Sequence, residues 1–148
     1  MKKILKIILV IICLVSIFMF SSDTGDSSST KSDGIIIKTF EFLKGRRLKY
    51  FEKEKYIDTY VVFIRKSAHF FIYFLLGVLV LSLLKEYKSF TFLLVIYATL
   101  FVFFYACSDE VHQLFVTGRS GEFLDVLLDS LGGFVGSISY YFIRSDKK

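Results

Sequence analysis

Both histidines of this sequence occur near side chains that could hold or transfer a proton. His69 lies three residues after Lys66 and four before Tyr73, and His112 lies three residues after Asp109. Because histidine titrates near neutral pH, a carboxylate that fixes its tautomer would allow acid–base chemistry. The acid–base candidates are His69, His112, Asp109, Glu110 and Asp125.

A second group of side chains could hold an anionic ligand. Arg119 lies in the sequence Gly118-Arg119-Ser120-Gly121, a flexible loop that can place a fork-shaped guanidinium on a phosphate or carboxylate. No serine, cysteine or threonine stands out as a nucleophile by its spacing, so an enzyme here would activate water or use a histidine. Binding without catalysis stays open. The ligand-binding candidates are Lys66, Arg119, Gln113 and Tyr73.

Two other interpretations use the same residues. Two histidines and several carboxylates could bind a metal ion, but the sequence has no His-Glu-x-x-His motif and no Cys/His ladder, and Glu110-x-His112 alone is a weak signal. We therefore assign no metal and no cofactor. Alternatively, Lys66 or Arg119 could pair with a carboxylate and clamp helix ends together in a low dielectric.

The elements that carry these residues are apolar and long. The chain has 148 residues, of which 54% are hydrophobic and 18% aromatic, with no proline. A soluble core would not be expected to hide so many apolar side chains, so a membrane is the expected solvent. Stretches of about 20 apolar residues can cross a bilayer as helices. The sequence predicts one all-α membrane domain over residues 1–148, with spans at 4–20, 61–84, 90–108 and 123–143.

The segment between the first two spans differs in composition. Residues 21–34 are rich in serine, aspartate and glycine and are expected to form a loop. In residues 35–58, Ile36, Phe40 and Leu43 recur at helical spacing among basic residues. This pattern fits either an amphipathic segment on the membrane surface or a solvated loop.

Four alternating spans bring the charged residues to one membrane face. The second span begins with Arg65, Lys66 and His69, the third ends before Asp109, and the fourth begins near Asp125. These three span ends share a face whichever way the chain is inserted. Ionisable groups inside a membrane persist where they pair, line a wet cavity or have a function. We therefore expect one polar site at this face.

Small residues continue this polar stripe along the fourth span. Asp125 and Asp129 are four residues apart, and Gly132 and Gly136 follow at helical spacing. Because the Gly-x-x-x-Gly pattern lets helix backbones approach closely, Asp129, Gly132 and Gly136 are assigned to helix packing. The stripe could serve one chain or join two copies as an oligomer.

The distribution of basic residues favours cytoplasmic termini. Short loops and the first helix dominate the positive-inside rule, whereas long loops cross largely regardless of charge. The first span lacks a pair of small residues before a cleavage point, so we expect an uncleaved anchor. The charged site then faces outward in the cell membrane. Nucleic-acid binding is not expected, because the sequence has no basic face that carries base-stacking aromatics. The basic residues used are Lys2, Lys3, Lys6, Lys85, Lys88, Arg144, Lys147 and Lys148.

These residues together resemble the VanZ-like family of small bacterial membrane proteins over nearly the whole chain. The resemblance implies an envelope protein of Gram-positive type, linked to tolerance of the glycopeptide teicoplanin, but no defined reaction. We expect the partners to be membrane lipids, with an anionic lipid or cell-wall precursor as the ligand. The sequence departs from the family at Asp23, often Gln, and at Thr117, often Pro. The matching motifs are Phe20-Ser21-Ser22, Arg65-Lys66-Ser67-Ala68-His69 with Tyr73, Ser108-Asp109-Glu110-Val111-His112-Gln113 with Phe115, Gly118-Arg119, Asp125, and Asp129 with Gly132-Gly133.

Overall fold

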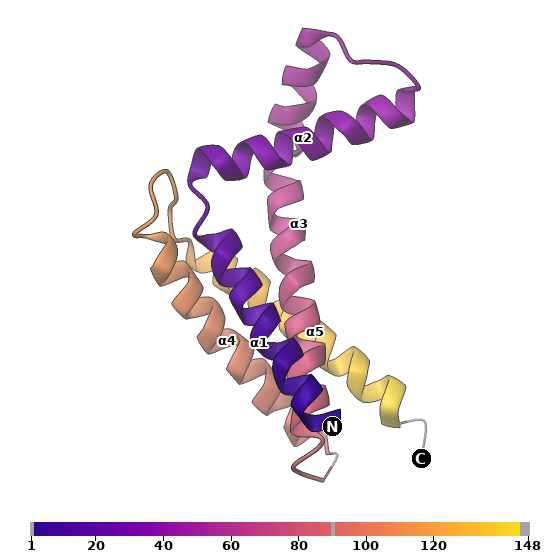
Figure 1. Ribbon diagram of the computed structural model, residues 1–148, viewed down its shortest axis with the longest axis vertical. Helices are drawn as coiled ribbons and strands as arrows, with labels where there is room; N and C mark the ends of the chain where they lie inside the picture. Colours follow the sequence, from indigo (N-terminus) through magenta and orange to yellow (C-terminus); the bar gives the residue numbers. More distant parts are fainter. Residues whose placement is uncertain (1, 90, 146–148) are drawn as a thin grey trace.

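The computed structural model describes residues 2–89 and 91–145, with side chains described from Lys3 onward. This part of the chain contains five helices and no strand, which confirms the predicted all-α fold. Phe90, where we expected the third span to begin, lies outside the described residues, as do Lys147 and Lys148. The helices are α1 (Lys2–Ser21), α2 (Gly25–Lys44), α3 (Tyr50–Leu84), α4 (Leu93–Gln113) and α5 (Phe123–Ser145) (Figure 1).

Helices α1, α3, α4 and α5 are long and apolar enough to cross a membrane. Their outward side chains are apolar as well: Ile4 is 63% exposed, and Phe71 and Phe104 are each 67% exposed. Such surfaces suit lipid, because every backbone polar group of a helix is bonded internally and only apolar atoms face the acyl chains. The fold is that of an integral membrane protein with four spans.

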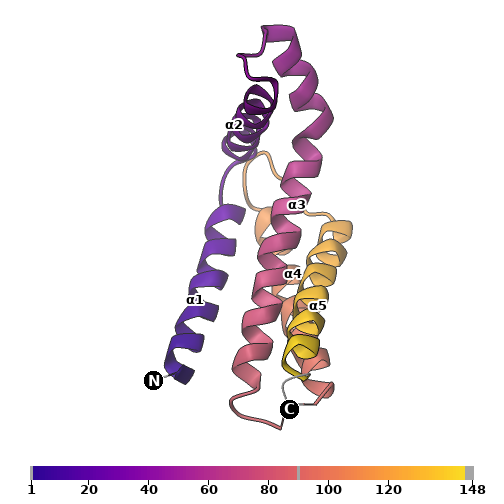
Figure 2. The same ribbon diagram turned by 90° about the vertical axis from the view of Figure 1, so that its right-hand side faces the viewer.

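Two spans are longer than the sequence indicates. Helix α3 begins at Tyr50 rather than at residue 61, and α4 ends at Gln113 rather than at residue 108. At 1.5 Å per residue, α3 is about 52 Å long, which exceeds the roughly 30 Å hydrocarbon core. Its first turns therefore extend beyond the bundle, as Figures 1 and 2 show. The extension of α4 places Asp109 and Gln113 on a helix instead of in a loop.

Most of the expected loop at residues 21–34 is helical, because α2 begins at Gly25. The Thr24 hydroxyl accepts a hydrogen bond from the Ser27 backbone N–H at 3.3 Å, and Asp26 places a negative charge in the first turn. Both features favour a helix start. Tertiary packing then outweighs the weak local preference: Ile36 is buried, and Phe40 stacks on Tyr56 of α3 with ring centroids 4.1 Å apart.

Helix α2 crosses the end of the bundle and packs on the projecting part of α3 (Figure 1). The loop that joins them is fixed by Glu52, which accepts bidentate hydrogen bonds from Arg46 at 2.8 and 2.9 Å. Since these groups lie beside each other, the Glu52 carboxylate raises the pKa of Arg46. Of the two alternatives for residues 35–58, a solvated loop is wrong, because both halves are helical.

The bundle is held together mainly by α3 and α5, which cross at small residues. A β-carbon on Gly132 would lie 2.5 Å from the Phe70 carbonyl oxygen, and one on Gly136 would clash with the Phe74 carbonyl. The predicted packing role of the glycine stripe is thus served within one chain. Self-association through the same stripe stays a prediction, and it would have to displace α3.

Helix α1 covers the α3 and α4 side of the bundle. Tyr105 of α4 donates a hydrogen bond to the Leu14 carbonyl at 2.7 Å, and Cys13 and Ile17 are buried against the core. The start of α1 and the end of α5 lie at the same end of the molecule, and α2 lies at the other (Figures 1 and 2). This arrangement matches the alternation of four spans on which the predicted site depends.

Candidate functional site

The charged residues of α3, α4 and α5 converge at the end of the bundle below α2. Lys66 of α3 forms an ion pair with Asp125 of α5 and a longer one with Glu122, at 3.6 Å. A lysine on one helix thereby joins the start of another. Lys66 and Asp125 are therefore paired with each other, in the way that the helix-clamp interpretation expects.

His69 lies one turn further along α3 and faces Asp129. Its Nδ1 atom is 3.5 Å from Asp129 Oδ2, and the Asp129 carboxyl group is fully buried. Asp109 of α4 is 4% exposed and belongs to the same cluster, because one donor atom from each of the three residues lies within 4.8 Å of the others. The carboxylate nearest to His69 is thus Asp129, which the sequence indicated only as a packing residue.

His112 lies at the same end of the bundle but faces α1. Its ring stacks on Phe18 at a centroid distance of 4.6 Å, and its Nε2 atom is 3.0 Å from the Ser22 hydroxyl. His112 lines neither of the two cavities described below. The structure therefore separates the two histidines that we had grouped in one acid–base site.

Glu110 and Gln113 are buried in the last turn of α4, next to the loop that follows. Glu110 accepts a hydrogen bond from the Glu122 backbone N–H at 2.8 Å. Gln113 donates to Glu110 at 3.1 Å and to Asp109 at 3.3 Å. Gln113 thus bridges two carboxylates, and Glu110 anchors the loop immediately before α5.

Arg119 is held over the end of the bundle by backbone carbonyl groups. It donates hydrogen bonds to the carbonyl oxygens of Asp23 at 3.2 Å and Phe20 at 3.3 Å. Partial burial and the nearby positive charge of Arg65 lower the pKa of Arg119. Within residues 2–89 and 91–145, Arg65 itself makes no hydrogen bond or ion pair.

Two cavities meet at these arginines. The larger, of about 300 Å³, is mostly apolar and is bordered by α1, α2, α3 and Arg119. The smaller, of about 150 Å³, is charged and lies between α3, α5, the end of α4 and the loop before α5. Arg65, His69 and Arg119 line both. The larger cavity is also lined by Ile17, Phe20, Ile35, Ile64, Ala68 and Ile72, with Asp23, Ser28, Lys31 and Ser32. The smaller one is also lined by Val62, Lys66, Gln113, Ser120, Glu122, Asp125 and Leu128.

Tyr73 lies below the cavities. Its side chain is fully buried, and its hydroxyl has no hydrogen-bond partner among the described residues. The ring lies near that of Tyr105, with centroids 6.4 Å apart. Tyr73 therefore lines neither cavity, although the sequence placed it on the same helix face as Lys66 and His69.

Sequence reasoning missed the contribution of α2 to the larger cavity. Lys31 and Ser32 line it, and Lys31 forms an ion pair with Asp23. Arg65 was recognised as part of the charged face but was given no role. The helical spacing of Ile36 and Phe40 was the signal that could have placed α2 above the site.

Fold and site together define an integral membrane protein with a buried polar cluster and two adjoining cavities at one end of a helical bundle. The family model VanZ/LLP1 matches residues 6–144. The chain therefore belongs to the VanZ/LLP1 family, which confirms the resemblance seen in its motifs. A search of curated proteins found no significant match, and a search of solved structures found none either.

Proposed function

We propose that this VanZ-like protein binds an anionic lipid or a wall-precursor headgroup at the outer face of the cell membrane. The observation that carries the proposal is the position of Arg65 and Arg119, which share the junction of an apolar and a charged cavity. Their like charges repel, and Arg65 has no anionic partner among the described residues. A phosphate or carboxylate between the two guanidinium groups would relieve that repulsion and accept charge-assisted hydrogen bonds.

The two cavities suit the two parts of an amphiphile. The larger has an apolar wall and, at about 300 Å³, lies at the lower end of the range for ligand pockets, roughly 300–1,000 Å³. It would take the part of an acyl or prenyl chain next to the headgroup. The smaller would take the headgroup itself, beside Lys66 and Gln113. A lipid that enters from the bilayer would thus meet apolar and charged surfaces in the expected order.

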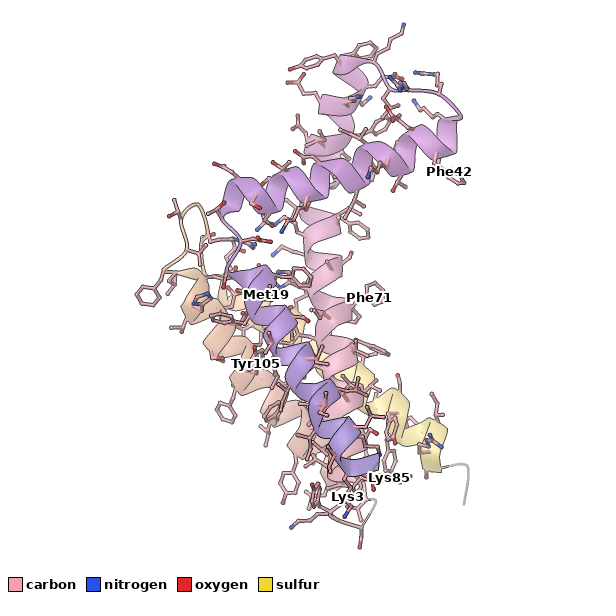
Figure 3. The ribbon with its side chains drawn as sticks, viewed as in Figure 1. Lys3, Met19, Phe42, Phe71, Lys85 and Tyr105 are labelled. Atoms are coloured by element: carbon pink, nitrogen blue, oxygen red, sulfur yellow. The ribbon has the colours of Figure 1, made fainter. Side chains whose placement is uncertain are left out.

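We further propose that both termini are cytoplasmic and that the cluster faces outward. Lys3 and Lys85 lie at the end of the bundle opposite Phe42 (Figure 3). The short connection that carries Lys85 weighs more in the positive-inside rule than the longer basic segment around α2. In this orientation, ligand binding would alter the outer envelope that teicoplanin encounters, which is how the tolerance expected for this family would arise.

If the ligand is also processed, His69 is the acid–base group that we assign. It borders both cavities, and Asp129 can fix its tautomer. The other acid–base candidates are less well placed: His112 faces α1, Glu110 anchors a backbone N–H, and Asp125 is paired with Lys66. A reaction would require a bound water as the nucleophile.

The alternative is a membrane scaffold whose charges only clamp the helices. The ion pairs of Lys66 with Asp125 and Glu122 favour it, since they join α3 to the start of α5. The clamp leaves Arg65 without a role. The two functions differ in their demands: a scaffold needs only a stable fold, whereas a binding protein needs the two arginines even when the fold is intact.

Lipid binding by the purified protein tests the proposal. We would titrate the detergent-solubilised protein with fluorescent phosphatidylglycerol and with the matching phosphatidylcholine, and repeat this with Arg119→Gln, Arg65→Gln and Arg47→Gln. Loss of one charge-assisted hydrogen bond is worth about 1.5–3 kcal/mol, so the first two variants should bind about ten- to a hundredfold more weakly. Arg47, an exposed residue outside both cavities, provides the matched control. Equal affinity for the neutral lipid, or an equal loss in the control, would contradict the proposal.

Cells expressing the protein test the link to teicoplanin. Tolerance should fall with Arg119→Lys and His69→Asn at normal membrane abundance measured by blot. If tolerance survives both changes, or fails only where the protein disappears, the clamp is the better account.

A further inference from the structure

Buried negative charge is concentrated where α3, α4 and α5 meet. His69, Asp109 and Asp129 each come from a different helix, and one donor atom of each lies within 4.8 Å of the others. Asp129 is fully buried and Asp109 is 4% exposed. Two carboxylates so close in a low dielectric repel each other strongly unless a positive charge lies between them.

Two buried polar atoms at this cluster lack a partner. Oδ1 of Asp129 and the hydroxyl oxygen of Tyr73 make no hydrogen bond to any described residue. Tyr73 is fully buried on α3, one helical turn after His69. Buried polar atoms that stay unpaired cost free energy, which makes this an incomplete site.

Nearby cations do not complete the cluster. Lys66 is paired with Asp125 and Glu122, and Arg119 donates its hydrogen bonds to backbone carbonyl oxygens. Gln113 donates one hydrogen bond to Asp109 at 3.3 Å, but it carries no charge. The His69 ring is thus the only side chain in the described chain that could bring positive charge into contact with Asp129.

We propose that His69, Asp109 and Asp129 form a binding site for a divalent metal ion, with Zn²⁺ as the best match. One imidazole nitrogen and two carboxylate oxygens are donors that Zn²⁺ accepts, and three protein ligands leave a position open for water or a ligand atom. In a tetrahedral site with bonds near 2.1 Å, neighbouring donors lie about 3.4 Å apart. His69 and Asp129, at 3.5 Å, already have this spacing. Donor atoms as far apart as 4.8 Å would approach by about 1.4 Å.

The surroundings fit the second layer of a metal site. Gln113 donates to Asp109, and Tyr73 supplies a hydroxyl that can donate to either carboxylate once the ligands close on the ion. Such partners orient ligating carboxylates and tune their basicity. The site has no local sequence motif, because its ligands are contributed by three helices. The sequence alone therefore did not predict a metal site.

A metal ion here would lie beside both cavities, since His69 lines each of them. Its open position could then take a phosphate oxygen of the headgroup; this part of the inference rests on the proposed function. The metal site itself does not, because zinc binding can be measured without any lipid.

Metal titration of the full-length protein in detergent tests the site. After dialysis against a chelator, ZnCl₂ is added and binding is followed by calorimetry, and Co²⁺ replaces Zn²⁺ to report coordination geometry by visible absorption. The wild type should bind one ion per chain, with Co²⁺ bands of a four-coordinate site. Asp129→Asn, Asp109→Asn and His69→Gln should each weaken binding at least tenfold. Asp125→Asn and His112→Asn, which remove a carboxylate and an imidazole outside the cluster, should change it less than twofold.

Three results would overturn the proposal. These are no saturable binding by the wild type, octahedral Co²⁺ spectra that the three ligand substitutions leave unchanged, or equal losses in the two controls. If Asp129→Asn does not fold, His69→Gln and the wild-type Co²⁺ spectrum still decide, because His69 is only partly buried. Loss of lipid binding in Arg119→Gln with zinc binding intact would separate the two proposals.

Discussion

Gly77 of α3 lies so close to the Gly133 carbonyl group of α5 that no β-carbon fits between them. The same crossing brings the Ser137 hydroxyl within 3.2 Å of the Gly77 carbonyl oxygen, to which it donates a hydrogen bond. Close approach of this kind replaces the hydrophobic effect as the cause of helix association inside a membrane. The contact fixes the depth and rotation of α5 against α3, and hence the position of Asp129 opposite His69.

Gly77→Ala should destabilise the protein. The new methyl group would meet the backbone of α5, which cannot rotate away, and overpacking of this kind costs about 1–3 kcal/mol. Thermal unfolding in detergent, followed by circular dichroism, should show a lower midpoint. Gly136→Leu, which meets the Phe74 carbonyl group, should have a larger effect of the same sign.

Gly34→Ala is the matched control for these substitutions. Gly34 lies inside α2, and a β-carbon there would meet nothing within 4 Å. Alanine favours a helix over glycine by up to about 1 kcal/mol, so the variant should be as stable as the wild type or more so. A loss equal to that of Gly77→Ala would mean that the close contact is not the cause.

The ion pair between Lys66 and Asp125 should contribute little to stability. Both side chains are partly exposed, and exposed pairs are worth about 1 kcal/mol or less. A double-mutant cycle with Lys66→Met and Asp125→Asn should therefore give a coupling energy of about 0.5–1 kcal/mol in the unfolding assay. A coupling above about 3 kcal/mol would favour the helix-clamp function over ligand binding.

The four spans were predictable because composition and length decide them. The sequence did not predict which side chains surround each residue in the bundle. Spacing along α4 makes Asp109 and His112 neighbours on the helix surface, but it does not say which of them meets α1 and which meets α5. In the structure Asp109 lies in the interior cluster, whereas His112 packs on Phe18. Rotation of a helix about its axis depends on contacts such as that between Gly77 and Gly133, which join distant parts of the sequence.

The first half of helix α2, which was expected to be a loop, escaped prediction for a related reason. This half has few apolar residues, and the stability of the helix depends on Ile36 and Phe40 packing against the extension of α3. Neither the segment that contains Ile36 and Phe40 nor the extension of α3 has a strong helix signal by itself. The larger cavity could not be predicted either, because its roof is formed by residues of α2 such as Lys31 and Ser32.

The two histidines should differ in function. Because His69 borders both cavities and His112 borders neither, His69→Asn should weaken phosphatidylglycerol binding at least tenfold, and His112→Asn should change it less than twofold. His112→Asn should instead lower the unfolding midpoint, since its ring stacks on Phe18 and bonds to Ser22. Equal loss of lipid binding in the two variants would contradict this assignment of the site.

Gly25→Ala should affect ligand binding through Arg119. Gly25 at the start of α2 donates a backbone hydrogen bond to the Thr117 carbonyl at 3.1 Å, and a β-carbon on it would collide with the Gly118 carbonyl group. The substitution would push the loop outward and move Arg119 with it. Phosphatidylglycerol affinity should fall while zinc binding stays within twofold. Ser29→Ala, further along the same helix, is the control and should leave both affinities unchanged.

The direction of insertion can be read from two engineered cysteines. With Cys13 and Cys107 changed to alanine, Phe42→Cys on α2 and Ser89→Cys after α3 place single thiols at opposite ends of the bundle, and both positions are exposed. If the short basic connection near Lys85 stays in the cytoplasm, a membrane-impermeant maleimide should label Phe42→Cys in intact cells and Ser89→Cys only after permeabilisation. The reverse pattern would place the cavities in the cytoplasm and rule out a ligand bound at the outer face. Because residues 31–55 carry eight of the 19 lysines and arginines of the chain, the same experiment also decides whether the length or the charge of this segment determined the topology.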